Sequence, residues 1–435
     1  MSRALRVVAL VLVAACGHAP SSGEAPRGDA SFVAVPAGLA ELHAAARVPG
    51  LELRTFDQAE LWHAIGPLLD DARHLRVEEI GRSAEGRPLR SVTFGSGATR
   101  VLMWSQMHGD ESTATMALAD LYAFIERNPT HPIARTIMDR LTVTTIPMLN
   151  PDGAERFQRR NAFGVDVNRD ARALATPEGR TLKAVFDRVD PDFAFNLHDQ
   201  DVGTRLGDTD EHVAIALLAP AFDESRAVND VRRRAMRVAG VFRSAIEPLV
   251  GGHVARYDDT FNPRAFGDLT TTWGASAVLV ESGAWPDDPE KQHLRRANFV
   301  GLLAALHAIA DGSYADADDR LYTSLPENGR SLPDLLVAGG TLVLPGLDPV
   351  RADLMIEFRN GARRTDGYVS DIGDLAGRDA LDTLDISGLF VMPSAAMLEH
   401  SEGPQLQPGA PARFQVSRTP NGPALWRFEG SPPAR

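Results

Sequence analysis

The stretch TRVLMWSQMHGDESTATMALADLYAFIERN, residues 99–128, decides the fold class of this sequence. It begins with an apolar run whose length is typical of a buried strand, and from residue 111 its apolar residues recur at the spacing of a helix. A buried strand that leads directly into an amphipathic helix is the building unit of α/β folds. His108 and Glu111 stand in the turn between the two elements, where Gly109 lets the chain turn tightly.

The same alternation of strand and helix continues to about residue 310. Further strands are predicted over 88–95, 141–149, 193–199, 215–222 and 276–283, and helices over 56–75, 177–189, 228–249 and 289–310. The short SGA connection between 88–95 and the strand over 99–106 predicts a hairpin. Together these elements predict an α/β domain with a mixed, largely parallel sheet sandwiched by helices.

After Ser313 the sequence changes to short strands separated by Gly, Pro and Asp, which predicts a small β-rich C-terminal domain. This part holds no cluster of ligands or nucleophiles, so we expect an accessory domain without chemistry of its own. The expected organisation is a signal peptide over 1–16, a tether and leader over 17–50, a catalytic domain over 51–313 and the β-rich domain over 320–435.

The N-terminus predicts export. MSRALRVVALVLVAAC has a basic start and an apolar run too short to span a bilayer, which indicates a secretory signal. VAAC resembles a bacterial lipobox, in which Cys16, the only cysteine, becomes lipidated. Because Gly17 follows Cys16, we expect anchoring in the outer membrane or periplasm rather than the inner membrane. The alternative is a plain signal peptide with an incidental cysteine.

The charge of the chain excludes one class of partner. The formal net charge is −13 and no run is dense in Lys or Arg, so nothing favours nucleic-acid binding. We expect contact with a membrane only through the lipid anchor, and a monomer.

Polar residues end four predicted strands, and the C-terminal edges of such strands are where sites form in open α/β sheets. The four sets are His108 with Glu111, Asn150 with Asp152, His198 with Asp199, and Glu281. Two His and one Glu are a donor set typical of catalytic zinc, which keeps a further position for water. We therefore expect one Zn²⁺ on His108, Glu111 and His198, with Glu281 as general base.

The segment RRNAFGVDVNRD, residues 159–170, adds a substrate end to this site. Asp166 is placed to hold a His ligand by its second ring nitrogen, a common way to orient such ligands. Asn168 and Arg169 offer donors suited to a carboxylate.

These motifs, in this order, resemble the zinc metallocarboxypeptidase family, the carboxypeptidase A-like enzymes. The resemblance covers residues 77–310 and rests on IGRSAEGRPL, HGDE, NPDG, RRN with GVDVNRD, NLHD and VESG. The resemblance implies the same three zinc ligands and the same general base, Glu281. It also implies that Asn168 and Arg169 bind the C-terminal carboxylate of a substrate. The residue that polarises the scissile carbonyl would be Arg159. Arg160 is one position away and is the alternative for that role. The family's active-site Tyr maps to Tyr257, although its distance from Glu281 requires a small gap.

The expected function is therefore that of a zinc metallocarboxypeptidase, which hydrolyses the C-terminal peptide bond of a peptide with a free carboxylate by attack of a zinc-bound water. One alternative is a zinc amide hydrolase of the same fold that acts on peptidoglycan stem peptides or N-acyl amino acids. Another is a catalytically idle lipoprotein that uses the cleft only for binding.

Overall fold

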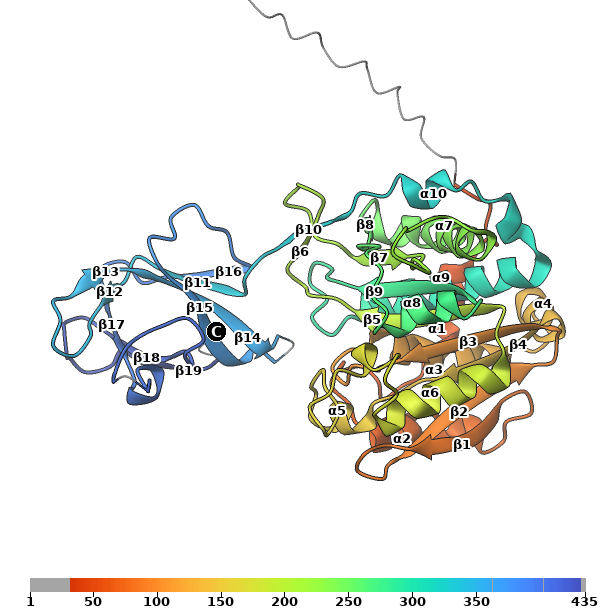
Figure 1. Cartoon of the computed structure of the whole chain (residues 1–435), viewed down its shortest axis with the longest axis horizontal. Helices are drawn as coiled ribbons and strands as arrows, with labels where there is room; N and C mark the ends of the chain where they lie inside the picture. The colour runs from red at the N-terminus through yellow and green to blue at the C-terminus, as the bar shows by residue number, and fades with distance from the viewer. Residues whose placement is uncertain (1–31, 362, 402, 432–435) are drawn as a thin grey trace, which may run out of the picture.

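The computed structural model describes residues 32–361, 363–401 and 403–431 (Figure 1). The predicted signal peptide, Cys16 and most of the tether lie outside these residues. Within them, no helix is both long enough and apolar enough to cross a membrane.

An eight-stranded mixed sheet forms the centre of the larger domain, in the order β1-β2-β4-β3-β5-β9-β7-β8. Four neighbouring strands, β4, β3, β5 and β9, run parallel, whereas β1, β2 and β7 join with antiparallel pairings. The strands are β1 (Arg76–Arg82), β2 (Pro88–Gly95), β3 (Thr99–Ser105), β4 (Leu141–Ile146), β5 (Phe193–Asp199), β7 (Ile215–Leu218), β8 (Val254–Arg256) and β9 (Ser276–Ser282). The predicted fold class is confirmed.

Helices cover both faces of this sheet because its central strands are apolar on both sides. Val101 and Met103 of β3 join one apolar core, and the alternate residues Leu102 and Trp104 join another. Helices that pack on the first face, or beside it, are α1 (Leu39–Ala46), α2 (Gln58–Leu69), α3 (Thr113–Arg127), α4 (Pro132–Arg140), α7 (Asp230–Val250) and α9 (Gln292–Asp311). The second face carries α6 (Pro177–Val189) and α8 (Phe266–Thr272), while the short α5 (Pro151–Glu155) follows β4.

The predicted hairpin between β2 and β3 is wrong, because β4 lies between these strands. The connecting segment instead crosses the start of β4, where the Gly97 amide donates to the Leu141 carbonyl at 3.0 Å. A Cβ at Gly97 would lie 1.8 Å from the Arg140 carbonyl carbon, so the glycine serves this backbone crossing rather than a hairpin turn.

The helix α1, which falls in the segment expected to be a leader, is packed into the larger domain. It contacts α3 and α9, and Leu39 and Ala46 are buried in the main core. The folded part of the larger domain therefore includes residues before position 51.

The C-terminal part forms two further sheets with their own apolar core, as predicted (Figure 1). A four-stranded sheet has the order β15-β14-β11-β16, and a five-stranded sheet has the order β13-β12-β17-β18-β19. After α10 (Arg320–Thr323), a linker strand, β10 (Asn328–Ser331), pairs with β6 (Thr204–Leu206) of the larger domain. The remaining strands are β11 (Leu335–Ala338), β12 (Thr341–Leu342), β13 (Val350–Arg351), β14 (Asp353–Asn360), β15 (Thr365–Gly373), β16 (Asp382–Asp385), β17 (Phe390–Pro393), β18 (Arg413–Ser417) and β19 (Trp426–Glu429).

Candidate active site

The carboxyl ends of β3, β5 and β9 bring the predicted site residues to one edge of the sheet. His198 of β5 is the register partner of Glu281 of β9. His108 and Glu111 lie in the turn that follows β3, and α3 begins two residues after Glu111 rather than at it. Parallel neighbouring strands therefore place the two histidines and two glutamates at the same edge.

The turn after β3 is held in shape by its own hydrogen bonds and by α5. The Glu111 amide donates to the His108 carbonyl, and the Gln106 side-chain amide donates to the Gly109 carbonyl at 2.9 Å. A Cβ on Gly109 would lie 2.0 Å from the Gly153 carbonyl carbon. Gly109 is thus required for close approach of the two backbones, which is a different reason from the tight turn expected from the sequence.

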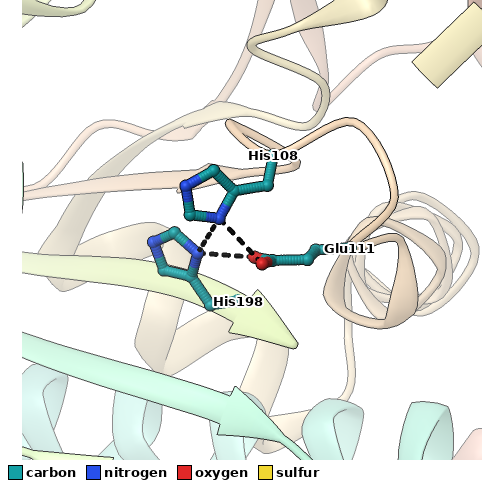
Figure 2. A group of neighbouring side chains, drawn as sticks. All are labelled: His108, Glu111 and His198. Atoms are coloured by element: carbon teal, nitrogen blue, oxygen red, sulfur yellow. Dashed lines mark hydrogen bonds and ion pairs between the residues drawn. The ribbon is translucent and has the colours of Figure 1, made fainter. Parts of the chain in front are cut away.

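Three side chains converge on one point in this edge (Figure 2). Glu111 Oε1 lies 2.7 Å from His108 Nδ1, Glu111 Oε2 lies 2.6 Å from His198 Nδ1, and the two Nδ1 atoms are 3.2 Å apart. All three residues are buried. Two imidazole nitrogens and one carboxylate at such distances form a compact donor set of the kind that zinc takes in catalytic sites.

The outer ring nitrogen of His108 faces a carboxylate, which fixes the tautomer that a metal ligand needs. His108 Nε2 lies 2.9 Å from Asp166 Oδ1, and a carboxylate can only accept. Nε2 therefore carries a proton, and Nδ1, which faces Glu111 and His198, is the ring nitrogen left for a metal. Burial alone would lower the pKa of His108, but the Glu111 and Asp166 carboxylates raise it to about 9, so a metal at Nδ1 would displace a proton. Burial lowers the pKa of His198 and so favours the neutral ring that binds a metal. The residues present fit a zinc ion.

The two glutamates at the site have opposite electrostatic environments. Burial alone would raise the pKa of Glu111, but His108 and His198 outweigh it and hold that pKa well below its usual range. Burial, together with the Glu111 charge, raises the pKa of Glu281 well above that of an ordinary glutamate. Among the described residues, no group forms a hydrogen bond with the side-chain carboxylate of Glu281. A carboxylate with raised proton affinity and free oxygens suits proton transfer, and a nearby cation would draw its pKa back down.

Of the two candidate arginines, Arg159 faces the site. Its Nη1 lies 3.2 Å from Glu111 Oε1, and its Nε and Nη2 donate to Asp166 Oδ2 at 3.1 and 3.0 Å. Arg160 points away and donates to the Gly164 carbonyl. The geometry therefore places Arg159, rather than Arg160, beside the His–Glu–His group.

One cavity of about 1120 Å³ is lined by Asn168, Arg169 and Tyr257 together with His108, Glu111 and Glu281. Asn168 lies in the short η1 helix (Val167–Arg169), and its side chain accepts from the Phe266 amide of α8 at 3.0 Å. The Arg169 guanidinium donates to the Asn168 carbonyl and keeps further N–H groups for a ligand. The Glu281 charge, followed by burial, raises the pKa of Tyr257 to about 12, so its hydroxyl remains a donor.

Asp152, which the sequence placed at a strand end with the site residues, has a structural role instead. Its carboxylate accepts from the Ser83 hydroxyl at 2.7 Å, from the Glu85 amide and from Arg87. It therefore anchors the 83–87 turn against α5.

Sequence reasoning missed a buried ion pair behind His198. Lys291 Nζ lies 3.1 Å from Asp199 Oδ2 and donates to the Ser282 carbonyl at 2.8 Å, which ties the ends of β5 and β9 together. Arg54 is 3.7 Å from the same Asp199 oxygen. The available signal was the rarity of lysine, because Lys291 is one of only two lysines in the chain.

A second group of potential ligands, Glu211, His212 and His253, lies near the surface at the start of β7 and β8. The centres of the two imidazole rings are 4.3 Å apart and their planes differ by 17°, so the nitrogen lone pairs lie in two nearly parallel planes, which disfavours convergence on one ion. Trp285 packs edge-on against both rings. We interpret this group as aromatic packing.

Comparison with known proteins agrees with this geometry. Residues 70–196 match the zinc carboxypeptidase family. The chain is 30% identical over 108 residues to probable carboxypeptidase 2 of Arthroderma benhamiae, which covers 25% of this chain and 20% of that protein. It is 31% identical over 102 residues to carboxypeptidase SOL1 of Arabidopsis thaliana, which covers 22% of this chain and 21% of that protein. The chain thus spans about a fifth of the length of these relatives.

A similar solved structure is bovine thrombin-activatable fibrinolysis inhibitor in complex with tick carboxypeptidase inhibitor, at a TM-score of 0.49 and 14% identity, covering 61% of this chain and 99% of that one. The family match includes His108, Glu111, Arg159 and Asp166 but ends before His198. His198 is joined to these residues by the geometry of the sheet. The family match and the buried His–Glu–His group together indicate a zinc site.

Proposed function

We propose that this chain, whose residues 70–196 carry the zinc carboxypeptidase family sequence, is a metallocarboxypeptidase that removes residues from the C-terminus of peptides. The observation that carries the proposal is the buried convergence of His108, Glu111 and His198, the first two of which line one cavity with Glu281 and Arg169. Each group that hydrolysis of a terminal peptide bond requires is present there in a suitable chemical form.

His108, Glu111 and His198 would hold the zinc, which supplies a Lewis acid that polarises a carbonyl and acidifies water. Asn168 and Arg169 bind the substrate carboxylate and set which peptide bond reaches the centre. Arg159 donates to the carbonyl oxygen as negative charge develops there, a contribution of about 3 kcal/mol for a single well-placed donor. Glu281 accepts a proton from the attacking water and returns it to the leaving amine.

Two expectations accompany this proposal and rest on sequence alone. The first is export, with a lipid anchor on Cys16 in the bacterial cell envelope, and the second is action as a monomer. The alternative amide hydrolase, with peptidoglycan stem peptides or N-acyl amino acids as substrates, would use the same zinc ligands and base.

To test the proposal, the zinc content of the full chain and the products that it forms from peptides are measured for the wild type and for three variants. Glu281→Gln should keep zinc and lose turnover by about 10²–10⁴-fold, because it removes the proton acceptor only. His198→Ala should lose zinc and turnover together. Glu224→Gln, an equal charge change on an exposed glutamate outside the cavity lining, should change neither. Products that lack only acyl groups or come from peptidoglycan alone would support the amide hydrolase, and full activity of Glu281→Gln would contradict the assignment of the base.

A further inference from the structure

The cavity at the candidate active site is not bounded by the larger domain alone. Part of its lining comes from the linker and from β14, in the β-rich C-terminal domain that was expected to have no chemistry of its own. These lining residues, which we call the β-domain wall, are Ser331, Leu332, Pro333, Asp334, Glu357, Phe358, Arg359, Asn360 and Gly361. The wall and the residues assigned to hydrolysis therefore face the same space.

The linker residues of this wall are held close to the proposed zinc ligands His108, Glu111 and His198. The Ser331 hydroxyl donates to Asp201 Oδ2 at 2.7 Å, and the Asn328 side chain donates to Gln200 Oε1 at 2.8 Å. Gln200 and Asp201 directly follow β5, which carries His198. The backbone pairing of β10 with β6 adds to these contacts, so the linker side has a defined position beside the site.

The other side of the wall reaches the loop that carries Arg159. The Asn360 side chain at the end of β14 donates to the Phe157 carbonyl at 3.5 Å, and the Arg363 guanidinium lies 5.7 Å from the centre of the Phe157 ring. The Arg54 guanidinium lies 5.6 Å from the same ring. Phe157 stands two residues before Arg159, so both edges of the wall adjoin residues next to the reacting centre.

The direction of the substrate follows from the two ends of the cavity. The carboxylate-binding Asn168 is backed by α8 through its bond to the Phe266 amide. The β-domain wall instead adjoins Phe157 and Asp201. A peptide with its carboxylate at Asn168 and Arg169 must extend its N-terminal part past Arg159 and out of the cavity, where this wall stands.

We propose that the β-domain wall binds the substrate residues on the N-terminal side of the scissile bond and favours cationic side chains there. The proposal rests on the proposed carboxypeptidase function, which fixes where the substrate carboxylate lies. It assigns the C-terminal domain a part in substrate selection.

The preference for cations follows from the charges at this end of the cavity. Three carboxylates line the cavity here: Asp334 and Glu357 of the wall, and Asp201, which accepts from the Ser331 hydroxyl. Asp334 accepts from the Phe358 amide and Glu357 from the Tyr368 hydroxyl, and each carboxylate has further lone pairs for a substrate cation. Burial raises the pKa of Asp334 to about 6, so its carboxylate is mostly charged at pH 7.5, the pH of the test.

The one arginine of the wall, Arg359, lies over the Tyr368 ring with its guanidinium carbon 4.8 Å from the ring centre. Of the two arginines beside Phe157, Arg54 lies 3.7 Å from Asp199 Oδ2 and Arg363 does not line the cavity. The three carboxylates therefore outnumber the cations that face the peptide here, and the net charge is negative.

The test compares two peptides that differ only in carrying Lys or Glu three and four residues before the scissile bond. An N-acyl dipeptide, too short to reach the wall, is the internal reference. The full chain should favour the Lys peptide over the Glu peptide by about tenfold in kcat/KM, since two partly exposed ion pairs contribute about that factor. In the double variant Asp334→Asn/Glu357→Gln, which keeps both hydrogen-bond acceptors, the ratio should fall to about twofold.

The control variant is Asp374→Asn, an exposed position of the same domain outside the cavity lining, which should keep the wild-type ratio. An unchanged ratio in the double variant, or an equal loss for the dipeptide and both peptides, would overturn the proposal.

Binding of the same labelled peptides to the Glu281→Gln chain, followed by fluorescence anisotropy, gives a readout without turnover. Lys-peptide binding that depends on Asp334 and Glu357 supports the β-domain wall, and binding of the two peptides with equal affinity overturns it. Wall-dependent binding in a wild-type chain that cleaves neither peptide would contradict the proposed function alone.

Discussion

His108 uses its two ring nitrogens for two tasks, and the second depends on Asp166. The contact at Nε2 holds the ring so that Nδ1 faces Glu111 and His198. Asp166 also accepts two bonds from Arg159, so one carboxylate positions both the proposed ligand His108 and the proposed catalytic cation Arg159. Asp166 thereby sets the orientation of both His108 and Arg159 in the candidate site.

Replacement of this carboxylate should weaken metal binding. We expect Asp166→Asn to lower zinc affinity by about 10–100-fold, because the amide no longer fixes the His108 tautomer. Competition with a chromophoric chelator measures the affinity. The control is Asp187→Asn, an exposed residue paired with Lys183, which should bind zinc like the wild type. Equal affinity of Asp166→Asn and wild type would contradict the role of Asp166.

Asp268 lines the cavity in a setting that disfavours its charge. Burial raises its pKa to about 6 from an ordinary value of 3.8. A carboxyl whose pKa is raised by folding contributes stability below the unfolded pKa, and this contribution is lost as pH rises through the folded pKa. Between pH 4 and 6 the charge of Asp268 thus becomes a growing cost to the folded state.

Asp268→Asn should therefore raise stability at pH 7.5 by roughly 1–2 kcal/mol, because the uncharged amide avoids the cost of a buried charge. Its Oδ1 can still accept from the Asn262 amide, as the carboxylate does at 2.9 Å. The gain should disappear near pH 4, where the wild-type carboxyl is protonated. Thermal unfolding at the two pH values measures it, and a gain of equal size at both would contradict the assigned pKa.

At the scale of elements, α1, α3 and α9 are joined by a buried ion pair. Arg295 of α9 donates to both oxygens of Asp120 of α3 at 2.7 and 2.6 Å, and neither side chain is exposed. His43 of α1 contacts the same carboxylate at 3.0 Å, and the Val48 amide donates to it. The N-terminal segment is thus tied to the domain by polar contacts as well as by its apolar face.

We expect Arg295→Met to lower the free energy of unfolding by about 3–5 kcal/mol, because it leaves the Asp120 charge buried without its main partner. Urea unfolding followed by circular dichroism measures the change. Arg127→Met, at the exposed end of α3, is the matched control and should cost under about 1 kcal/mol. A loss of similar size in both variants would show that the buried pair contributes little.

Elements with strong local signals could be predicted from the sequence almost to the residue. The apolar run FAFNLHD is β5 and the Pro177 start of α6 is correct, because buried strands and helix starts have local chemical signatures. Sheet order could not be predicted in the same way. The hairpin of β2 with β3 was wrong because pairing with β4 depends on contacts between Gly97 and residues beyond position 140, which no local pattern reveals.

In the candidate site, too, some residues could be predicted from local sequence signals and others depend on tertiary contacts. The histidines and glutamates could be selected because strand ends are recognisable, and family resemblance supplied their roles. Only the structure could decide between Arg159 and Arg160, because the side chains of these neighbouring loop residues point in different directions. The partner of Asp199 was also missed, since Lys291 lies far along the chain.

At the scale of the whole molecule, the β-rich domain lines part of the candidate cavity, and its proposed role in substrate selection follows from that position. Its strands were predicted, but its position beside the cavity depends on tertiary contacts such as those of Ser331 and Asn360. A domain that carries no catalytic cluster can thus contribute to a site through its position.

The central claim is that this molecule uses zinc to hydrolyse peptides from a free C-terminal carboxylate. The most direct measurement compares two otherwise identical peptides, one with a free C-terminus and one with a C-terminal amide, by mass spectrometry of products formed by the zinc-loaded full chain. Because Asn168 and Arg169 are expected to bind the carboxylate, the free peptide should lose residues stepwise, and the amide should be cleaved at least about 10²-fold more slowly. Equal cleavage of both peptides, or unchanged cleavage after zinc is removed by a chelator, would contradict the claim.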